Sequence, residues 1–326
     1  MLEDNSTKEI YIDTQAEIIL SSLPSGLIVK PALVWKIGKS TSEDVKVSYL
    51  CEGFNWSANY VVEILEKTLN IAGWAEIENQ SGATFENAKI KLIAGDVNRV
   101  EDDDKYVLSK RVYLCEESEA PKVEEKAFFD YHMYTLASPS TLKNNQTKQI
   151  NILNGLGIPY KKYYKLDRKS KKANVIIEFS NKKECGLGRP LPKGIIKLYK
   201  ADEADNSLEF IGEDRIEHTP KDEDIILNIG NAFDISFISK EIERKKINGF
   251  EHFKYQYIIK NHKTETAEVH FEHYIWGIWE MVKTTHDYSK KSSNIVEFTV
   301  NVPADNEITV ELEYKVDHRK EFIVKS

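Results

Sequence analysis

The sequence predicts an all-β protein made of two antiparallel β-sandwich domains of the immunoglobulin-like class, arranged in tandem. Apolar and polar residues alternate with period two along most of the chain, turn residues separate the alternating runs, and helical periodicity is nearly absent. Short strands at such spacing are typical of sandwiches. The chain has 326 residues, of which 41% are hydrophobic, and this is enough for two cores because a domain averages about 150 residues.

The expected strands follow one another from residue 45 to residue 316. In each of them, apolar side chains at alternate positions define one buried face. The last two runs are joined by residues 303–306, whose turn chemistry predicts an antiparallel hairpin. The runs are 45–49, 60–64, 90–92, 195–199, 225–229, 255–259, 269–274, 296–302 and 308–316.

One segment, residues 239–247, carries helix signals. Ser239 is a suitable N-cap, and Ile242 and Lys246 lie four positions apart among good helix formers. Its apolar content is thin for a helix that packs on a core, so the segment fits a charged hairpin tip equally well.

The Gly- and Pro-rich segment 186–192 separates two groups of strands and predicts a domain boundary. We expect an N-terminal sandwich over residues 1–188 and a C-terminal sandwich over residues 189–326. The downstream part has its own alternating strands in about the length of one sandwich domain, so we expect it to fold alone.

Two short segments resemble each other. Residues 75–79 and 257–261 each end at an asparagine, and each is followed by a polar turn and a second run that begins at Ala88 or Ala267. Because Asn at a strand end is common turn chemistry, shared local geometry explains this match without a duplication of the chain.

Charge and composition argue against several classes of protein. The 45 basic and 53 acidic residues give a net charge of −8, which disfavours nucleic acid as a partner. No apolar stretch reaches the roughly 18 residues of a spanning helix, and the acidic N-terminus lacks an export signal, so a cytoplasmic location is favoured. Cys51, Cys115 and Cys185 are too sparse for a disulfide framework or a zinc motif.

The sequence contains no motif for a cofactor or a metal, and we expect neither. His270 and His273 are three positions apart, which places them on opposite faces of a strand. The acidic runs 96–104 and 202–206 lack the order of a calcium loop and fit solvated turns. The basic run 161–172 surrounds two tyrosines and could follow a phosphate backbone, but in an acidic chain a charged hairpin with its tip at residues 168–172 is favoured.

The best candidate for a binding patch is formed by Tyr274, Trp276 and Trp279. The two tryptophans lie on either side of Gly277 and point to opposite faces of a regular strand, so one of them is expected to be exposed. An exposed tryptophan beside Tyr274 would indicate a protein-binding surface. His132 is a further candidate because it is polar within an aromatic run, and its alternative role is that of a hydrogen-bonded, partly buried side chain.

Several segments occur in one recognisable order: residues 53–60, 79–88, 92–97, 131–136, 147–149, 191–194 and 212–214. Together they resemble the bacterial domain-of-unknown-function 4139 family, some of whose members are called mucoidy-inhibitor-A-like, over about residues 23–316. The resemblance implies no catalytic residue and no ligand. It also implies that longer relatives carry another β-rich domain, and often a coiled coil, before this region, so the chain resembles a C-terminal portion.

The lack of a catalytic motif favours a non-catalytic structural or protein-interaction module over an enzyme. The alternative is a carbohydrate-active hydrolase or a carbohydrate-binding sandwich that uses loop carboxylates. A concave acidic cleft would favour this alternative, whereas a flat aromatic patch would favour the interaction module.

Overall fold

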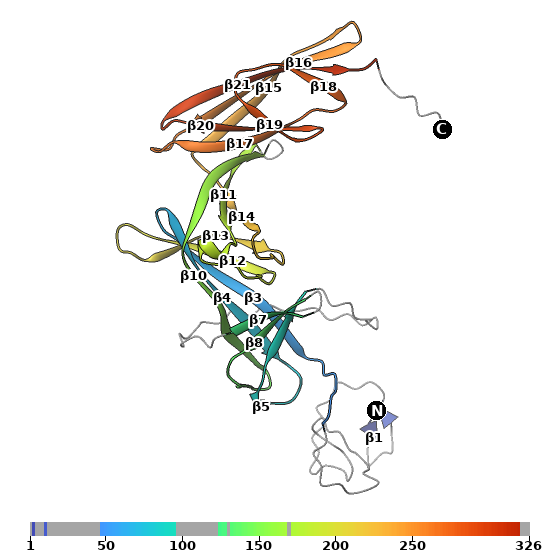
Figure 1. The fold of residues 1–326 in the computed structure, drawn as a ribbon, viewed down its shortest axis with the longest axis vertical. Helices are drawn as coiled ribbons and strands as arrows, with labels where there is room; N and C mark the ends of the chain where they lie inside the picture. The colour runs from blue at the N-terminus through green and yellow to red at the C-terminus, as the bar shows by residue number, and fades with distance from the viewer. Residues whose placement is uncertain are drawn as a thin grey trace.

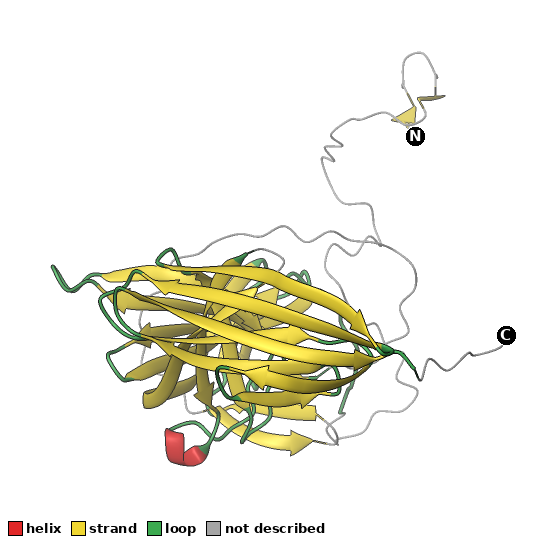
Figure 2. Cartoon of the chain, turned by 90° about the horizontal axis from the view of Figure 1, so that it is seen from above, coloured by secondary structure: helices red, strands yellow, loops and turns green. Residues whose placement is uncertain are grey.

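Strands form nearly all of the regular structure of this chain (Figure 1, Figure 2). The computed structural model describes residues 2–3, 10–11, 46–95, 123–128, 131–167 and 171–319. In this part of the chain the one helical element is the 3-10 turn η1 (Lys183–Cys185). The all-β fold predicted from the alternating pattern is therefore confirmed.

The strands fall into two groups on either side of η1. The strands before it are β1 (Leu2–Glu3), β2 (Ile10–Tyr11), β3 (Phe54–Ile64), β4 (Thr68–Asn79), β5 (Phe85–Ala88), β6 (Lys91–Ala94), β7 (Val123–Phe128), β8 (Tyr131–Leu136), β9 (Ser140–Leu142), β10 (Gln146–Asp167) and β11 (Lys172–Ser180). Those after it are β12 (Gly194–Ala201), β13 (Leu208–Ile216), β14 (Asp224–Asn231), β15 (Ile235–Ile247), β16 (Phe250–Asn261), β17 (Ala267–Tyr274), β18 (Ile278–Thr284), β19 (Tyr288–Ser292), β20 (Ile295–Val302) and β21 (Asn306–Asp317).

Two sheets carry most of the fold. The larger runs in the order β13-β12-β3-β4-β10-β17-β20-β19, and β11 and β14 join it through β10. The second has the order β15-β16-β21-β18. Among the described residues, smaller sheets are formed by β6-β8-β7, by β5-β9 and by β1-β2. Figure 1 shows the second sheet packed over β17, β19 and β20 at the C-terminal end of the molecule.

Strand β10 belongs to both ends of the molecule. Its first part, up to Pro159, pairs with β4, and its second part, from Tyr160, pairs with β11. Tyr164 and Lys165 in the second part also pair with β17. One continuous strand therefore carries the chain from one core to the next, and β11 runs back beside it (Figure 1).

The buried side chains form two separate cores. The first takes residues from β3 to β14, and the second takes residues from the end of β10 to β21. Strand β12 lies after the Gly- and Pro-rich segment, yet it pairs in parallel with β3 and buries Ile196 and Leu198 in the first core. The packing thus groups residues on both sides of the predicted boundary between 188 and 189 into one core. The predicted boundary concerns which segments fold independently of each other, and it stays a prediction.

The C-terminal end is a sandwich in which one predicted pairing is wrong. Strands β20 and β21 occur where the alternating runs predict them, but β20 pairs with β17 and β19, whereas β21 pairs with β16 and β18. Both strands bury an apolar face in the second core. The turn at residues 303–306 therefore crosses from one sheet to the other, and the two strands face the second core from opposite sides of the sandwich.

Two other local predictions concern single segments. Of the two alternatives for residues 239–247, the helix is wrong and the charged hairpin is found, because the segment is part of β15, which pairs with β16 through a turn at Asn248 and Gly249. The strand predicted at 45–49 is not formed in its described part, because residues 46–50 are exposed and pair with no strand.

The basic run forms the hairpin that its turn pattern predicts. Strands β10 and β11 pair up to Asp167 and Lys172. Residues 168–170, at the predicted tip, lie outside the described residues, as do the acidic run 96–104 and Cys115.

The two similar segments share a pattern of hydrogen bonds. Asn79 ends β4 and Asn261 ends β16, and both side chains are buried. In each case Oδ1 accepts from the backbone N–H two positions later, and Nδ2 donates to the carbonyl four positions later. The partners are Ser81 N at 3.1 Å and Ala83 O at 2.9 Å for Asn79, and Lys263 N at 3.0 Å and Glu265 O at 2.8 Å for Asn261.

The match extends beyond local turn geometry. The Nδ2 of Asn79 also donates to Leu142 O at 3.0 Å, and that of Asn261 donates to Val302 O at the same distance. Leu142 is soon followed by β10, which pairs with Asn79. In the same way, Val302 is soon followed by β21, which pairs with Asn261. The two halves of the chain therefore contain the same type of strand connection, and one buried asparagine closes it in each half.

Candidate binding surfaces

An exposed apolar patch lies where β17 ends and β18 begins. We call Tyr274, Trp276 and Ile278 the tip patch, and their exposed fractions are 46%, 75% and 56%. Between them Ile275 is buried in the second core, and its N–H donates to Asn294 O at 2.9 Å. Gly277 has a φ of +92°, which favours glycine. This tight, anchored turn directs Trp276 away from the core.

Trp279 serves as an anchor. Its ring packs against the second core, and its Nε1 donates to Ser293 O at 2.7 Å. The Lys290 ammonium lies 4.2 Å from the centre of the ring, within the range of a cation–π contact. Of the two tryptophans that the sequence singles out, the structure thus exposes Trp276 and uses Trp279 to hold β18 against the turn before β20.

His132 lies far from the tip patch. It is on β8, whereas the tip patch is at the opposite end of the molecule (Figure 1). Its Nδ1 is 2.8 Å from Glu125 Oε1 on the neighbouring strand β7. The structure therefore does not bring the four candidate residues into one site, and the contact of His132 fits its alternative role as a hydrogen-bonded side chain.

His270 and His273 lie on opposite faces of β17, as their spacing predicts. The ring of His270 stacks on Tyr163, with 4.2 Å between ring centres, on the outer face of the sheet. His273 is buried, and its Nδ1 lies 2.8 Å from the Tyr257 hydroxyl. No group of three His, Cys, Asp or Glu side chains within the described ranges is placed to hold a metal ion.

A charged cluster centred on Glu272 lies beside the tip patch. Glu272 is paired with Lys291 at 2.8 Å and Lys165 at 3.2 Å, and the Tyr274 hydroxyl donates to it at 2.9 Å. These contacts, led by the hydrogen bond from Lys291, lower the pKa of Glu272 to about 2 against the opposing effect of burial. The cluster joins β10, β17 and β19 and fixes the phenol of Tyr274.

We expect Glu272→Gln to reduce the loss of stability in acid. Since folding lowers the pKa of Glu272, its carboxylate stabilises the native state above pH 4.5, and this contribution is lost as the pH falls from 4.5 to about 2. Urea unfolding at several pH values should show a steeper loss for the wild type than for the variant. Lys291→Met should give an intermediate slope, and parallel slopes for wild type and Glu272→Gln would contradict the assignment.

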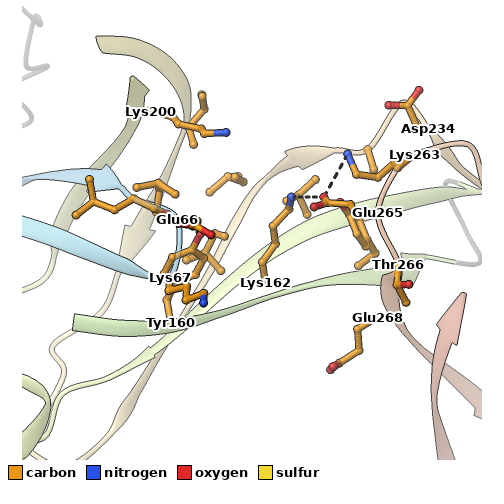
Figure 3. Close-up of a pocket in the computed structure, with 18 of the residues that line it drawn as sticks. Glu66, Lys67, Tyr160, Lys162, Lys200, Asp234, Lys263, Glu265, Thr266 and Glu268 are labelled. Carbon is orange, nitrogen blue, oxygen red and sulfur yellow. Dashed lines mark hydrogen bonds and ion pairs between the residues drawn. The ribbon is translucent and has the colours of Figure 1, made fainter. Parts of the chain in front are cut away.

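A second surface, the junction groove, lies between the two cores and has a volume of about 680 Å³. Figure 3 shows that charged side chains from several turns surround it. Its lining comes from β3 and the β3–β4 turn, from β10, β11, β12 and β13, from β14 and the β14–β15 turn, and from the β16–β17 turn and β17. The apolar residues among the lining are Ile64, Leu65, Val175, Ile177, Ile211, Ile229, Ala232 and Phe233, and the charged ones are Glu66, Lys67, Lys162, Lys200, Asp234, Lys263, Glu265 and Glu268.

Sequence reasoning does not find the junction groove, because its residues come from segments far apart in the chain and share no motif. One signal is local. Phe233 is a lone large apolar residue in the polar turn that joins β14 to β15, and it is 97% exposed. The alternating pattern of the strands does not explain a large apolar side chain in a short turn.

Comparison with known proteins adds no relative. No family model matches the sequence, and a search of curated proteins finds no match. Within the described residues, no helix is long and apolar enough to cross a membrane. The resemblance to the domain-of-unknown-function 4139 family accordingly stays a prediction.

Proposed function

We propose that this chain is a non-catalytic structural module that binds another protein through the tip patch. The observation that carries the proposal is the 75% exposure of Trp276 on a turn whose flanking residues, Ile275 and Trp279, are anchored in the core. Tryptophan and tyrosine are enriched at the energetic centres of protein interfaces, since a rigid ring buries a large area at a small entropic cost.

The adjoining edge strand indicates the form of the partner. In the described part of the chain β18 pairs only with β21, so its other edge is open. Ile278 and Val282 on β18 are both more than half exposed. An extended segment of the partner that adds to this edge would gain backbone hydrogen bonds from β18 and place apolar side chains against the tip patch.

The proposal includes the finer fold class and the family. A four-stranded sheet packed on β17, β20 and β19, with apolar faces between them, supports an immunoglobulin-like sandwich at the C-terminal end. The order of the segments that resemble the domain-of-unknown-function 4139 family supports membership of that bacterial family.

We expect Trp276→Ala to weaken partner binding strongly with little change in stability. The probe is a displayed library of random linear peptides, panned on the purified protein, because a strand-adding partner is an extended segment. The exposed ring contributes little to folding, so unfolding should shift by no more than about 0.5 kcal/mol. Peptides enriched on the wild type should bind Trp276→Ala at least roughly tenfold more weakly, as for a hot-spot residue.

The matched control is Leu156→Ala on β10. Leu156 is 76% exposed, close to the 75% of Trp276, but it lies in the other half of the chain. This variant should bind the selected peptides as the wild type does. If panning enriches no common motif, or if the enriched peptides bind Trp276→Ala unchanged, the tip patch is not the binding surface.

A further inference from the structure

The junction groove lies at a gap in the large sheet. Strand β4 pairs with β10 only as far as Pro159, and β17 begins to pair with it at Tyr164. No described strand pairs with residues 160–163 on that side of β10. The five-residue step from 159 to 164 spans about 16 Å at the usual strand rise. The volume of about 680 Å³ lies within the usual range for sites that bind small molecules.

The charges of the junction groove balance. Lys162 and Lys263 both reach Glu265, at 3.4 Å and 3.8 Å, as the dashed lines in Figure 3 show. Glu268 pairs with His270 at 2.7 Å. The charged lining residues whose side chains form no hydrogen bond or ion pair within the described part of the chain are two cations and two anions, namely Lys67, Lys200, Glu66 and Asp234.

This balance of charged side chains indicates which class of ligand the junction groove can bind. A ligand that fills the groove and carries a net charge of either sign would lie beside two like charges, Glu66 and Asp234 for an anion or Lys67 and Lys200 for a cation. A purely apolar ligand would strip water from four charged groups without replacing their hydrogen bonds. A neutral ligand rich in hydroxyl groups donates to the carboxylates and accepts from the ammonium groups, so it satisfies all four side chains.

The exposed ring of Phe233 supplies an apolar platform in the same groove. The turn that carries it is held on both sides, because Ala232 N–H donates to Ala173 O at 2.7 Å and His262 N–H donates to Asp234 O at 2.9 Å. Phe233 nevertheless remains 97% exposed. An exposed ring on a turn with a held backbone, beside both donors and acceptors, matches a sugar ring, which has an apolar face of C–H groups and an edge of hydroxyl groups.

We propose that the junction groove binds a short neutral saccharide, with Phe233 under one sugar ring and Lys67, Lys200, Glu66 and Asp234 on its hydroxyl groups. This site is separate from the tip patch, which lies in the β17–β18 turn. It needs no catalytic step. The length of the gap fits a few sugar units laid along β10 between the β3–β4 and β16–β17 turns.

The test is isothermal titration calorimetry of the full chain with four neutral trisaccharides: maltotriose, cellotriose, laminaritriose and triacetylchitotriose. At least one should bind, with a Kd below about 10 mM. Phe233→Ala should weaken that binding roughly fivefold to tenfold, the effect of losing one stacked ring. Lys200→Met should also weaken it. Trp276→Ala, which removes an exposed ring at the tip patch, should leave it unchanged.

Two further measurements separate this proposal from its alternatives. Because the ligand is neutral, raising the sodium chloride concentration should leave the Kd within about twofold, whereas an ionic ligand would be strongly screened. Dodecanoate, an amphipathic anion, is titrated in parallel. The proposal is overturned if no trisaccharide binds, if Phe233→Ala and the wild type bind equally, or if dodecanoate competes for Phe233 more tightly than every sugar. None of these outcomes bears on Trp276 and peptide binding.

Discussion

Replacement of Asn261 by alanine is expected to destabilise the protein by about 3–4 kcal/mol, one of the largest effects of any single substitution outside the apolar cores. The buried Nδ2 of Asn261 lies 2.8 Å from Glu265 O and 3.0 Å from both Val302 O and Pro303 O. Alanine leaves these carbonyls without their donor, and the lost bond to Val302 O is buried. Each hydrogen bond contributes about 1 kcal/mol, and a buried unpaired carbonyl costs about 1–3 kcal/mol.

Urea unfolding followed by tryptophan fluorescence measures this effect. Asn79→Ala should be similarly costly, because Asn79 makes the equivalent bonds in the other half of the chain. Asn154→Ala is the control, since Asn154 is exposed and its amide bonds, among the described residues, only the partly buried Asn151 side chain, so the change should stay within about 0.5 kcal/mol. A loss below about 1 kcal/mol for both buried asparagines would show that the strand connection does not depend on them.

These asparagines show what sequence could and could not predict about the fold. The spacing after Asn79 and Asn261 is visible in the sequence, and turn chemistry accounts for the bonds to residues two and four positions later. The bonds to Leu142 and Val302 join positions 63 and 41 residues apart. No local rule contains them, because they depend on which strand returns beside the asparagine.

The Gly- and Pro-rich segment illustrates the same limit. Gly186 and Gly188 do adopt positive φ angles of +94° and +73°, as expected for a turn between two groups of strands. The segment is nevertheless fixed to the first core, because the buried Tyr60 hydroxyl donates to Pro192 O at 2.7 Å and that of Tyr134 donates to Pro190 O at 2.8 Å. A turn signal gives a change of direction, and only the tertiary contacts decide whether the chain leaves the domain.

The tip patch and the junction groove also differ in how far the sequence could predict them. One of the two tryptophans is exposed, as expected from the sequence, but alternation along one strand is not the reason, because Trp276 lies in the turn between β17 and β18 and Trp279 lies on β18. The junction groove depends on where β10 passes from β4 to β17, which is a change of long-range partners. Its most exposed residue, Phe233, has no neighbour in the sequence that indicates a site.

The packing also predicts that a fragment of residues 189–326 lacks a cooperative fold. The second core would lose Tyr164, Leu166 and Ala173, which β10 and β11 supply. The fragment would also expose Ile196, Leu198 and Leu227, which are fully buried in the first core of the whole chain. Each of these large side chains forfeits about 2 kcal/mol when it returns to water, against a typical domain stability of about 5–15 kcal/mol.

Thermal unfolding by circular dichroism and amide NMR dispersion test this on purified fragments. We expect residues 189–326 to aggregate or to melt without a sharp transition, and residues 160–319 to recover a cooperative melt, because that fragment regains the second half of β10 and all of β11. Apart from residues 320–326, the two fragments differ by residues 160–188, which hold the second half of β10, β11 and η1, and β3 and β4 are absent from both. A soluble 189–326 fragment with dispersed amides and a sharp melt would instead support the boundary that the Gly- and Pro-rich segment predicts, and would mean that β15 to β21 form a core that tolerates the loss of one edge of the large sheet.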